Sequence, residues 1–274
     1  MKITFKAYTN KSSVSHQVVF FTEGLKMQNM SLENNASVLE TLKKMGFEGK
    51  KSEIRVIPGS HKGAPFLVAV GAGKSFKLSA LEQVKAGVQA FQLIKGHSLE
   101  GIQVSTAPFS KQKDPEEFFQ RFLEGMDLGA YTFDQFKTKE NEDKKTKQNI
   151  DVFIAGDVLA SKEALKAMNL IMEGNRLTRK VVDLPPNIVN PEYMAKEAKK
   201  LATKGAKVKV LKERELEKLG CNLMMAVGRG ATTADQPRMI IIEWRGGKKS
   251  QPLHAIVGKG VTFDTGGYSL KPPQ

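Results

Sequence analysis

Cysteine is nearly absent from this chain of 274 residues, which contains Cys221 alone. A disulfide within the chain is therefore excluded, which suits a reducing compartment. Cys221 lies in the apolar run LGCNLMMAV, which indicates a buried structural thiol and not a nucleophile. No window approaches the roughly 18 apolar residues of a membrane span. The opening MKITFKAYTN lacks the apolar stretch and cleavage site of a signal peptide. We expect a cytoplasmic protein with no membrane partner.

Several common catalytic and metal-binding motifs are also missing. The four histidines include no i, i+4 pair, and neither HExxH nor CxxC occurs, so a histidine-based zinc site is unsupported. No GxSxG elbow is present. The segment GAGKS (residues 71–75) has Val68 where a phosphate-binding P-loop needs its first glycine. A glycine-rich turn after a strand explains that segment better.

Acidic residues are outnumbered by basic ones, since 43 Lys and Arg against 29 Asp and Glu give a net charge of +14. This balance indicates either a solvated surface or affinity for polyanions such as nucleic acid. The basic residues are scattered along the chain and are not gathered in one block with aromatics. DNA binding therefore stays open as an alternative, supported by charge alone.

Strand-like and helix-like patterns alternate along the chain, which is typical of an α/β protein with a layered sheet. A charged, polar stretch at residues 137–151 indicates a surface loop. The Pro-Pro pair at 185–186 ends a long helical pattern, and Asn190–Pro191 begins another. We expect strands at 2–8, 15–21, 53–59, 65–73, 101–107, 151–158, 206–212, 237–247 and 253–263. Helices are expected at 31–47, 79–96, 114–131, 161–182, 191–205 and 213–220.

The last segment, VGKGVTFDTGGYSLKPPQ (residues 257–274), carries the most chemistry in the sequence. In one continuous strand Lys259 and Asp264 would lie on opposite faces, unless Gly258 and Gly260 supply a bulge. The carboxyl ends of strands are where ligands bind in open α/β sheets. The pattern alone leaves two interpretations open, a ligand site or a strand and turn with a solvated lysine.

This segment resembles the signature of the leucyl aminopeptidase (cytosol aminopeptidase) family of dinuclear metallopeptidases. Three further stretches resemble family motifs in the same order: EGMDLGAYTFDQFK (124–137), NRLTRKVVDLPPNIVNPEYMA (175–195) and MMAVGRGATTADQPRMIIIEWRG (224–246). The similarity spans most of the chain and is weakest over residues 1–60. Asp183 departs from the family, which usually has asparagine there, but it lies outside the expected metal site.

The resemblance implies an α/β fold with a macro-like amino-terminal domain and the first part of a metallopeptidase catalytic domain. We expect these domains at 1–160 and 184–274, joined by a linker helix at 161–183. Lys259 and Asp264 would be metal ligands, with Asp264 bridging two divalent cations, Mn²⁺ or Zn²⁺. Lys271 would polarise the carbonyl oxygen of a peptide substrate and stabilise the oxyanion.

The family's other metal carboxylates and its catalytic arginine belong to stretches that this sequence does not contain. We therefore expect an aminopeptidase that releases N-terminal residues such as leucine, but only with the remaining C-terminal part of the catalytic domain, in the same or a separate chain. The resemblance also suggests a homohexamer. The alternative is a non-enzymatic module that binds nucleic acid or a nucleotide-like ligand through its basic surface and macro-like domain.

Overall fold

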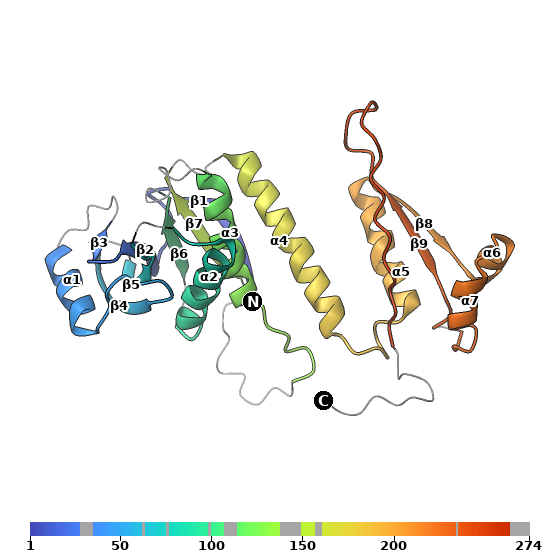
Figure 1. Ribbon diagram of the computed structural model, residues 1–274, viewed down its shortest axis with the longest axis horizontal. Helices are drawn as coiled ribbons and strands as arrows, with labels where there is room; N and C mark the ends of the chain where they lie inside the picture. The colour runs from blue at the N-terminus through green and yellow to red at the C-terminus, as the bar shows by residue number, and fades with distance from the viewer. Residues whose placement is uncertain are drawn as a thin grey trace. The chain divides into compact units, whose positions relative to one another are not determined.

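The computed structural model describes residues 1–27, 35–61, 64–74, 77–97, 100–106, 114–137, 149–156, 161–233 and 235–263. The chain divides into two compact units, unit 1 (Met1–Thr178) and unit 2 (Arg179–Gln274). The division falls inside helix α4 (Lys162–Asp183), where the linker helix was expected (Figure 1).

Unit 1 is built on a seven-stranded sheet with the order β1-β7-β6-β2-β5-β4, and β3 pairs with β2. The neighbouring strands β1, β7, β6, β2 and β5 pair in parallel. Strand β4 pairs antiparallel with β5, and β3 pairs antiparallel with β2. The strands are β1 (Lys2–Ala7), β2 (His16–Thr22), β3 (Lys26–Met27), β4 (Ile54–His61), β5 (Ala64–Gly71), β6 (Gly101–Ser105) and β7 (Asn149–Ala155).

The central strand β2 is buried along its whole length, so it needs apolar side chains on both of its faces. Val18 and Phe20 face a large core shared with α2 (Ala80–Ile94), α3 (Pro115–Ala130) and the first part of α4. Val19 and Phe21 face a smaller core closed by α1 (Asn35–Lys44), which lies beside β3 and β4 in Figure 1. Both faces of the sheet are thus covered at β2.

The helices of unit 1 begin where the sequence signals them. Ser79 caps α2 in a reciprocal capping box with Glu82, and Pro115 occupies the first turn of α3. The hydroxyl of Ser161 accepts a hydrogen bond from the Ala164 amide, 3.1 Å away, at the start of α4. These caps explain why the helix positions were predicted well.

Unit 2 has a small two-stranded antiparallel sheet of β8 (Lys207–Leu211) and β9 (Met239–Glu243). The chain passes from α4 through a proline turn into α5 (Pro191–Lys199), followed by a 3₁₀ turn at Lys200–Lys204. Short helices α6 (Glu213–Lys218) and α7 (Asn222–Gly228) join the two strands. The fully buried apolar residues of this sheet and these two helices are Leu211, Leu216 and Met225.

Three sequence predictions need correction. Residues 253–263 form no strand, and Asn149–Asp151, predicted as the end of a loop, belong to β7. Cys221 is half-buried beside the small cluster of unit 2, so it is less enclosed than predicted. The rest of the expected loop, residues 138–148, lies outside the described residues. In the described part of the chain, no helix has the length and apolarity to cross a membrane.

Candidate active site

Of the three predicted site residues, the structure describes only Lys259. Its side chain is exposed, and it lies in a segment without helix or strand. Asp264 and Lys271 lie outside the described residues. The structure therefore neither brings these three side chains together nor separates them, and their shared site stays a prediction.

The strand predicted over residues 253–263 does not form around Lys259. A Cβ atom added at Gly258 or Gly260 would meet no other atom within 4 Å, so neither glycine is needed for close packing here. The neighbouring Ile256 and Val257 are 98% and 96% exposed. The physical reason is that a strand needs a hydrogen-bonded neighbour, and among the residues that the structure describes, β8 and β9 pair with each other and not with this segment.

The donor groups near Lys259 suit a divalent cation only in part. A lysine amine binds a cation when it is neutral, and the carboxylate of Asp264 follows five residues later. Within the ranges that the structure covers, no cluster of three or more His, Cys, Asp or Glu side chains could hold a metal ion. Lys259 and Asp264 thus stay predicted metal donors, and the described residues add no cluster of further ligands.

The linker helix is fixed to unit 1 by polar contacts as well as by its apolar face. The Asn169 side chain bonds to both the amide and the carbonyl of Phe5 in β1, each at 2.9 Å. Arg176 forms an ion pair with Asp127 of α3, which is only 2% exposed. These two ionic residues come from two different family-like motifs, so the ion pair joins Asp127 of one motif to Arg176 of the other.

The proline turn that follows α4 in unit 2 is closed by local hydrogen bonds. The amides of Ile188 and Val189 both donate to the carbonyl of Pro185. Leu184 and Val189 are buried, and the Asn190 side chain accepts from the Tyr193 amide at 2.9 Å to cap α5. The motif NRLTRKVVDLPPNIVNPEYMA thus serves as a connector with fixed local geometry.

A contact in unit 1 between a buried and an exposed histidine was not predicted. His16 is fully buried on β2, and its Nε2 atom lies 3.0 Å from Nδ1 of the exposed His97. Its Nδ1 atom lies 2.9 Å from the Ser15 hydroxyl, and its ring stacks on Phe66. Burial, and secondarily the charge of His97, lowers the pKa of His16 to about 4. The two histidines are 81 residues apart, so sequence spacing gave no signal of this contact.

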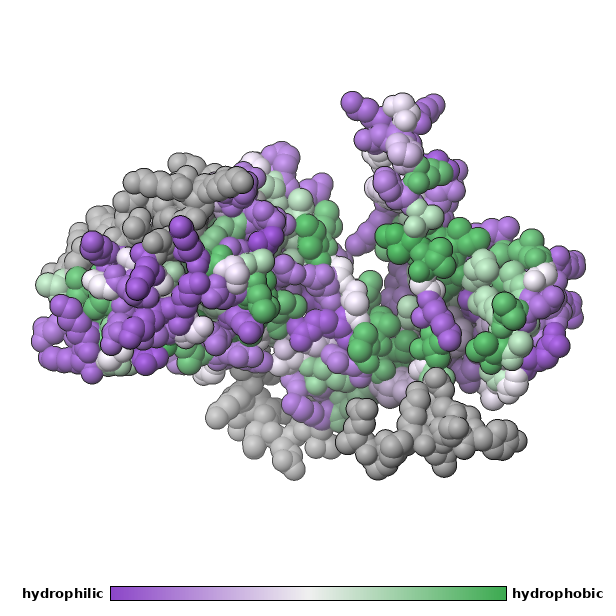
Figure 2. Space-filling view, in the orientation of Figure 1, coloured by the Kyte–Doolittle hydropathy of each residue, from purple (hydrophilic) through white to green (hydrophobic). Residues whose placement is uncertain are grey.

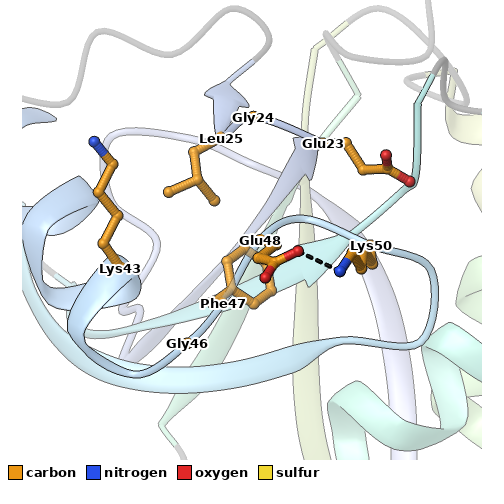
Figure 3. Close-up of a pocket in the computed structure, with 8 residues that line it drawn as sticks. All are labelled: Glu23, Gly24, Leu25, Lys43, Gly46, Phe47, Glu48 and Lys50. Atoms are coloured by element: carbon orange, nitrogen blue, oxygen red, sulfur yellow. Dashed lines mark ion pairs between the residues drawn. The ribbon is translucent and has the colours of Figure 1, made fainter.

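An open pocket of about 420 Å³ lies between the turn after β2 and the end of α1 (Figure 3). An ion pair between Lys50 and Glu48 crosses part of its rim. The lining residues are Glu23, Gly24, Leu25, Lys43, Gly46, Phe47, Glu48 and Lys50. This mixed lining gathers neither metal ligands nor a nucleophile with a base, so it carries no catalytic assignment.

Comparison with known families matches consecutive parts of the chain to two domains of one family. The N-terminal domain of the Cytosol aminopeptidase family matches residues 18–140, and the catalytic domain of the same family matches residues 176–274. The chain belongs to the cytosol aminopeptidase family. The catalytic-domain match includes the segment with Lys259, Asp264 and Lys271.

Curated relatives in this family are about twice as long as the chain. A probable cytosol aminopeptidase of Agrobacterium fabrum is 37% identical over 248 residues, which cover 86% of this chain and 47% of the relative. A cytosol aminopeptidase of Pseudomonas aeruginosa is 35% identical over 210 residues, covering 75% and 42%. The chain therefore spans somewhat less than half the length of these cytosol aminopeptidases.

Solved structures of similar proteins share the fold. The bottromycin maturation enzyme BotP in complex with Mn superposes with a TM-score of 0.72, at 22% identity, over 94% of this chain and 50% of that one. A mutant of tomato leucine aminopeptidase gives a TM-score of 0.63, at 20% identity, over 88% and 50%. The α/β class expected from the sequence is confirmed, and the structure adds that the sheet of unit 1 is mainly parallel.

Proposed function

We propose that this chain supplies the N-terminal half of a metal-dependent aminopeptidase that releases N-terminal amino acids such as leucine from peptides. The observation that carries the proposal is the match of the family's catalytic domain through the segment containing Lys259, Asp264 and Lys271. The name of the Pseudomonas aeruginosa relative supports the reaction class.

The proposed roles follow from the chemistry of each side chain. Lys259 as a neutral amine and Asp264 as a carboxylate would hold metal, and Asp264 has the two oxygens needed to bridge a pair of ions. A pair of divalent cations, when bound, would supply an activated water. The solved relative in complex with Mn favours Mn²⁺ as the first metal to test. Lys271 would donate to the oxyanion that forms from the substrate carbonyl.

Hydrolysis of leucine p-nitroanilide with added Mn²⁺ tests this proposal. We expect no metal-dependent release from residues 1–274 alone, and release when the remaining part of the catalytic domain is present. In that assembled protein, Lys271→Ala should lower kcat by about 10²–10³-fold, as loss of an oxyanion donor does. Lys249→Ala is the matched control, because Lys249 is an exposed lysine of the same unit. An assembled, Mn²⁺-loaded protein that releases no leucine would contradict the proposed function.

A further inference from the structure

The open pocket of unit 1 has walls that local backbone hydrogen bonds hold in place (Figure 3). On one side, the amide of Leu25 donates to the carbonyl of Thr22 and closes the turn between β2 and β3. On the other side, α1 ends in a Schellman motif, in which the amides of Gly46 and Phe47 donate back to carbonyls of the last turn. The cavity of about 420 Å³ is therefore preformed, and its size suits a small organic ligand.

Leu25 gives the pocket an apolar wall in a strained backbone conformation. Its φ angle is 56°, in the left-handed region that leucine rarely adopts. The side chain belongs to the same small core as Phe47, which also lines the pocket. Strain of this kind is often found at ligand sites, where the surrounding packing maintains it. Figure 2 shows a mainly hydrophilic surface over α1 with small hydrophobic areas, so a charged ligand suits this face better than an apolar partner.

The four charged residues of the pocket divide into one ion pair and two side chains outside it. Lys50 and Glu48 pair with each other. Glu23 and Lys43 form no ion pair with any residue that the structure describes. Figure 3 shows these two side chains on opposite sides of Leu25. The pocket thus presents one carboxylate and one ammonium with apolar surface between them.

The carboxylate side of the pocket has an excess of negative charge. The hydrogen bond to Glu48 and the charge of that residue raise the pKa of Lys50, and the charges of Glu53 and Glu23 raise it further. Three carboxylates are therefore close to one ammonium on this side. On the other side, Lys43 is a cation without a paired carboxylate. A ligand with an ammonium at one end and a carboxylate at the other complements both sides.

We propose that this pocket binds a short peptide with free termini, with the peptide ammonium at Glu23 and the peptide carboxylate at Lys43. A free amino acid fits less well, because one carbon atom carries both of its charged groups, whereas the pocket separates its own two charges by Leu25. The cavity volume suits a peptide of about two or three residues. An apolar side chain of the peptide would contact Leu25 and Phe47.

This peptide site belongs to unit 1, whereas the predicted catalytic residues Lys259, Asp264 and Lys271 belong to unit 2. It is therefore a second peptide site, through which the protein would sense the peptides that it cuts. That role rests on the proposed function, whereas the binding itself does not.

Titration of the full 274-residue chain with the tripeptide Leu-Gly-Gly tests the binding. EDTA is present throughout, so that the peptide stays intact. We expect the amide NMR signals of Gly24, Gly46 and Phe47 to shift and to saturate below about 10 mM peptide, a concentration that fills even a millimolar site. Signals that do not saturate there, or shifts confined to unit 2, would overturn the proposal.

Blocked peptides and matched variants test the two assigned ends. Acetyl-Leu-Gly-Gly and Leu-Gly-Gly amide should each bind roughly three- to tenfold more weakly, because each lacks one charge. Glu23→Gln should weaken the free peptide by a similar factor and leave the acetylated peptide unaffected, and Lys43→Ala should do the same for the amidated peptide. Lys44→Ala is the matched control, because Lys44 ends the same helix but pairs with Glu40 and does not line the pocket. Equal effects of Lys43→Ala and Lys44→Ala, or equal binding of free and blocked peptides, would overturn the proposal.

Failure of this inference and failure of the proposed function give different results. An assembled enzyme that cleaves leucine p-nitroanilide, but whose Gly24 and Gly46 signals do not respond to Leu-Gly-Gly, would overturn the peptide site alone. Saturable binding at these residues, in a chain whose assembled form has no peptidase activity, would contradict only the proposed function.

Discussion

His16 has no exposed surface, so burial disfavours the charged form of its ring. If His16 and His97 were both charged, two N–H groups would face each other across 3.0 Å. Burial, and secondarily the charge of His97, thus favour the neutral His16 ring.

This arrangement predicts acid sensitivity of unit 1. The pKa of His16 is about 4 in the folded protein and near 6.5 when unfolded, so the unfolded state binds more protons between those values. The contribution of His16 to the free energy of unfolding is nearly complete above pH 6.5 and is lost as the pH drops toward 4. Between pH 7 and 5 we expect His16 to cost about 2 kcal/mol of unfolding free energy. Urea unfolding at both pH values measures this loss.

His16→Phe is the comparison for that measurement, because phenylalanine keeps the stacking on Phe66 but does not titrate. The variant should lose about 2 kcal/mol less than the unsubstituted protein between pH 7 and 5. Equal losses in both proteins would mean that His16 is not the group responsible.

Helices α2 and α3 approach each other at glycines on both sides. A Cβ at Gly87 would lie 2.0 Å from the carbonyl oxygen of Phe122, and one at Gly125 would lie 2.1 Å from that of Val84. Both obstacles are backbone atoms, which side-chain rotation cannot move. The close approach thus depends on these glycines, in spite of the entropy that glycine costs inside a helix.

Gly87→Ala should therefore destabilise the protein by about 1–3 kcal/mol, although alanine favours helix. Gly174→Ala in α4 is the control, because a Cβ there meets nothing within 4 Å. The control should gain up to about 1 kcal/mol from helix propensity. Thermal unfolding of the two variants measures the contrast, and similar shifts in Tm for both would contradict the packing argument.

The attachment of α4 to α3 depends on the buried pair of Arg176 and Asp127. Their side chains are 14% and 2% exposed. Arg176→Met should destabilise unit 1 by about 3 kcal/mol, because it leaves a buried carboxylate without its cationic partner. Arg121→Ala breaks the exposed pair with Glu117 and should cost less than about 1 kcal/mol. If urea unfolding gave equal effects, the Arg176 pair would be no more than a surface contact.

Local signals predicted the elements that local interactions stabilise. Ser79 and Asn190 mark helix starts by capping amides three residues along, and Pro115 marks one as the first residue of α3. The strand prediction for residues 253–263 was wrong because a strand forms only beside a partner strand. An apolar pattern carries no information on whether such a partner is available. The contact of His16 with His97 was missed for the same reason, since it depends on the fold and not on spacing.

The candidate site shows this limit most clearly. Lys259 and Asp264 were found by the residue types and the family motif, not by geometry. Their distance from each other, and from Lys271, depends on how the backbone turns after residue 263, beyond the last described position. Sequence predicts which residues act as donors, but the arrangement of a metal site needs its complete ligand set.

At the scale of the whole chain, the two units differ in how much apolar surface they bury. The cores of unit 1 enclose both faces of its sheet at β2, with ten phenylalanine, leucine and isoleucine side chains among the largest fully buried groups beside β2's own Phe20. The sheet of unit 2 rests on a cluster of Leu211, Leu216 and Met225. Since stability follows buried apolar area, unit 2 should open well before unit 1.

Native-state hydrogen exchange on the full chain checks this difference. After correction for intrinsic rates, amides of β8 and β9 should exchange roughly a hundredfold or more faster than those of β2 and β6, because few buried contacts oppose their opening. The comparison is internal, so protein concentration and buffer are the same for both sets. Equal protection would show that unit 2 has stability that its own described core does not explain.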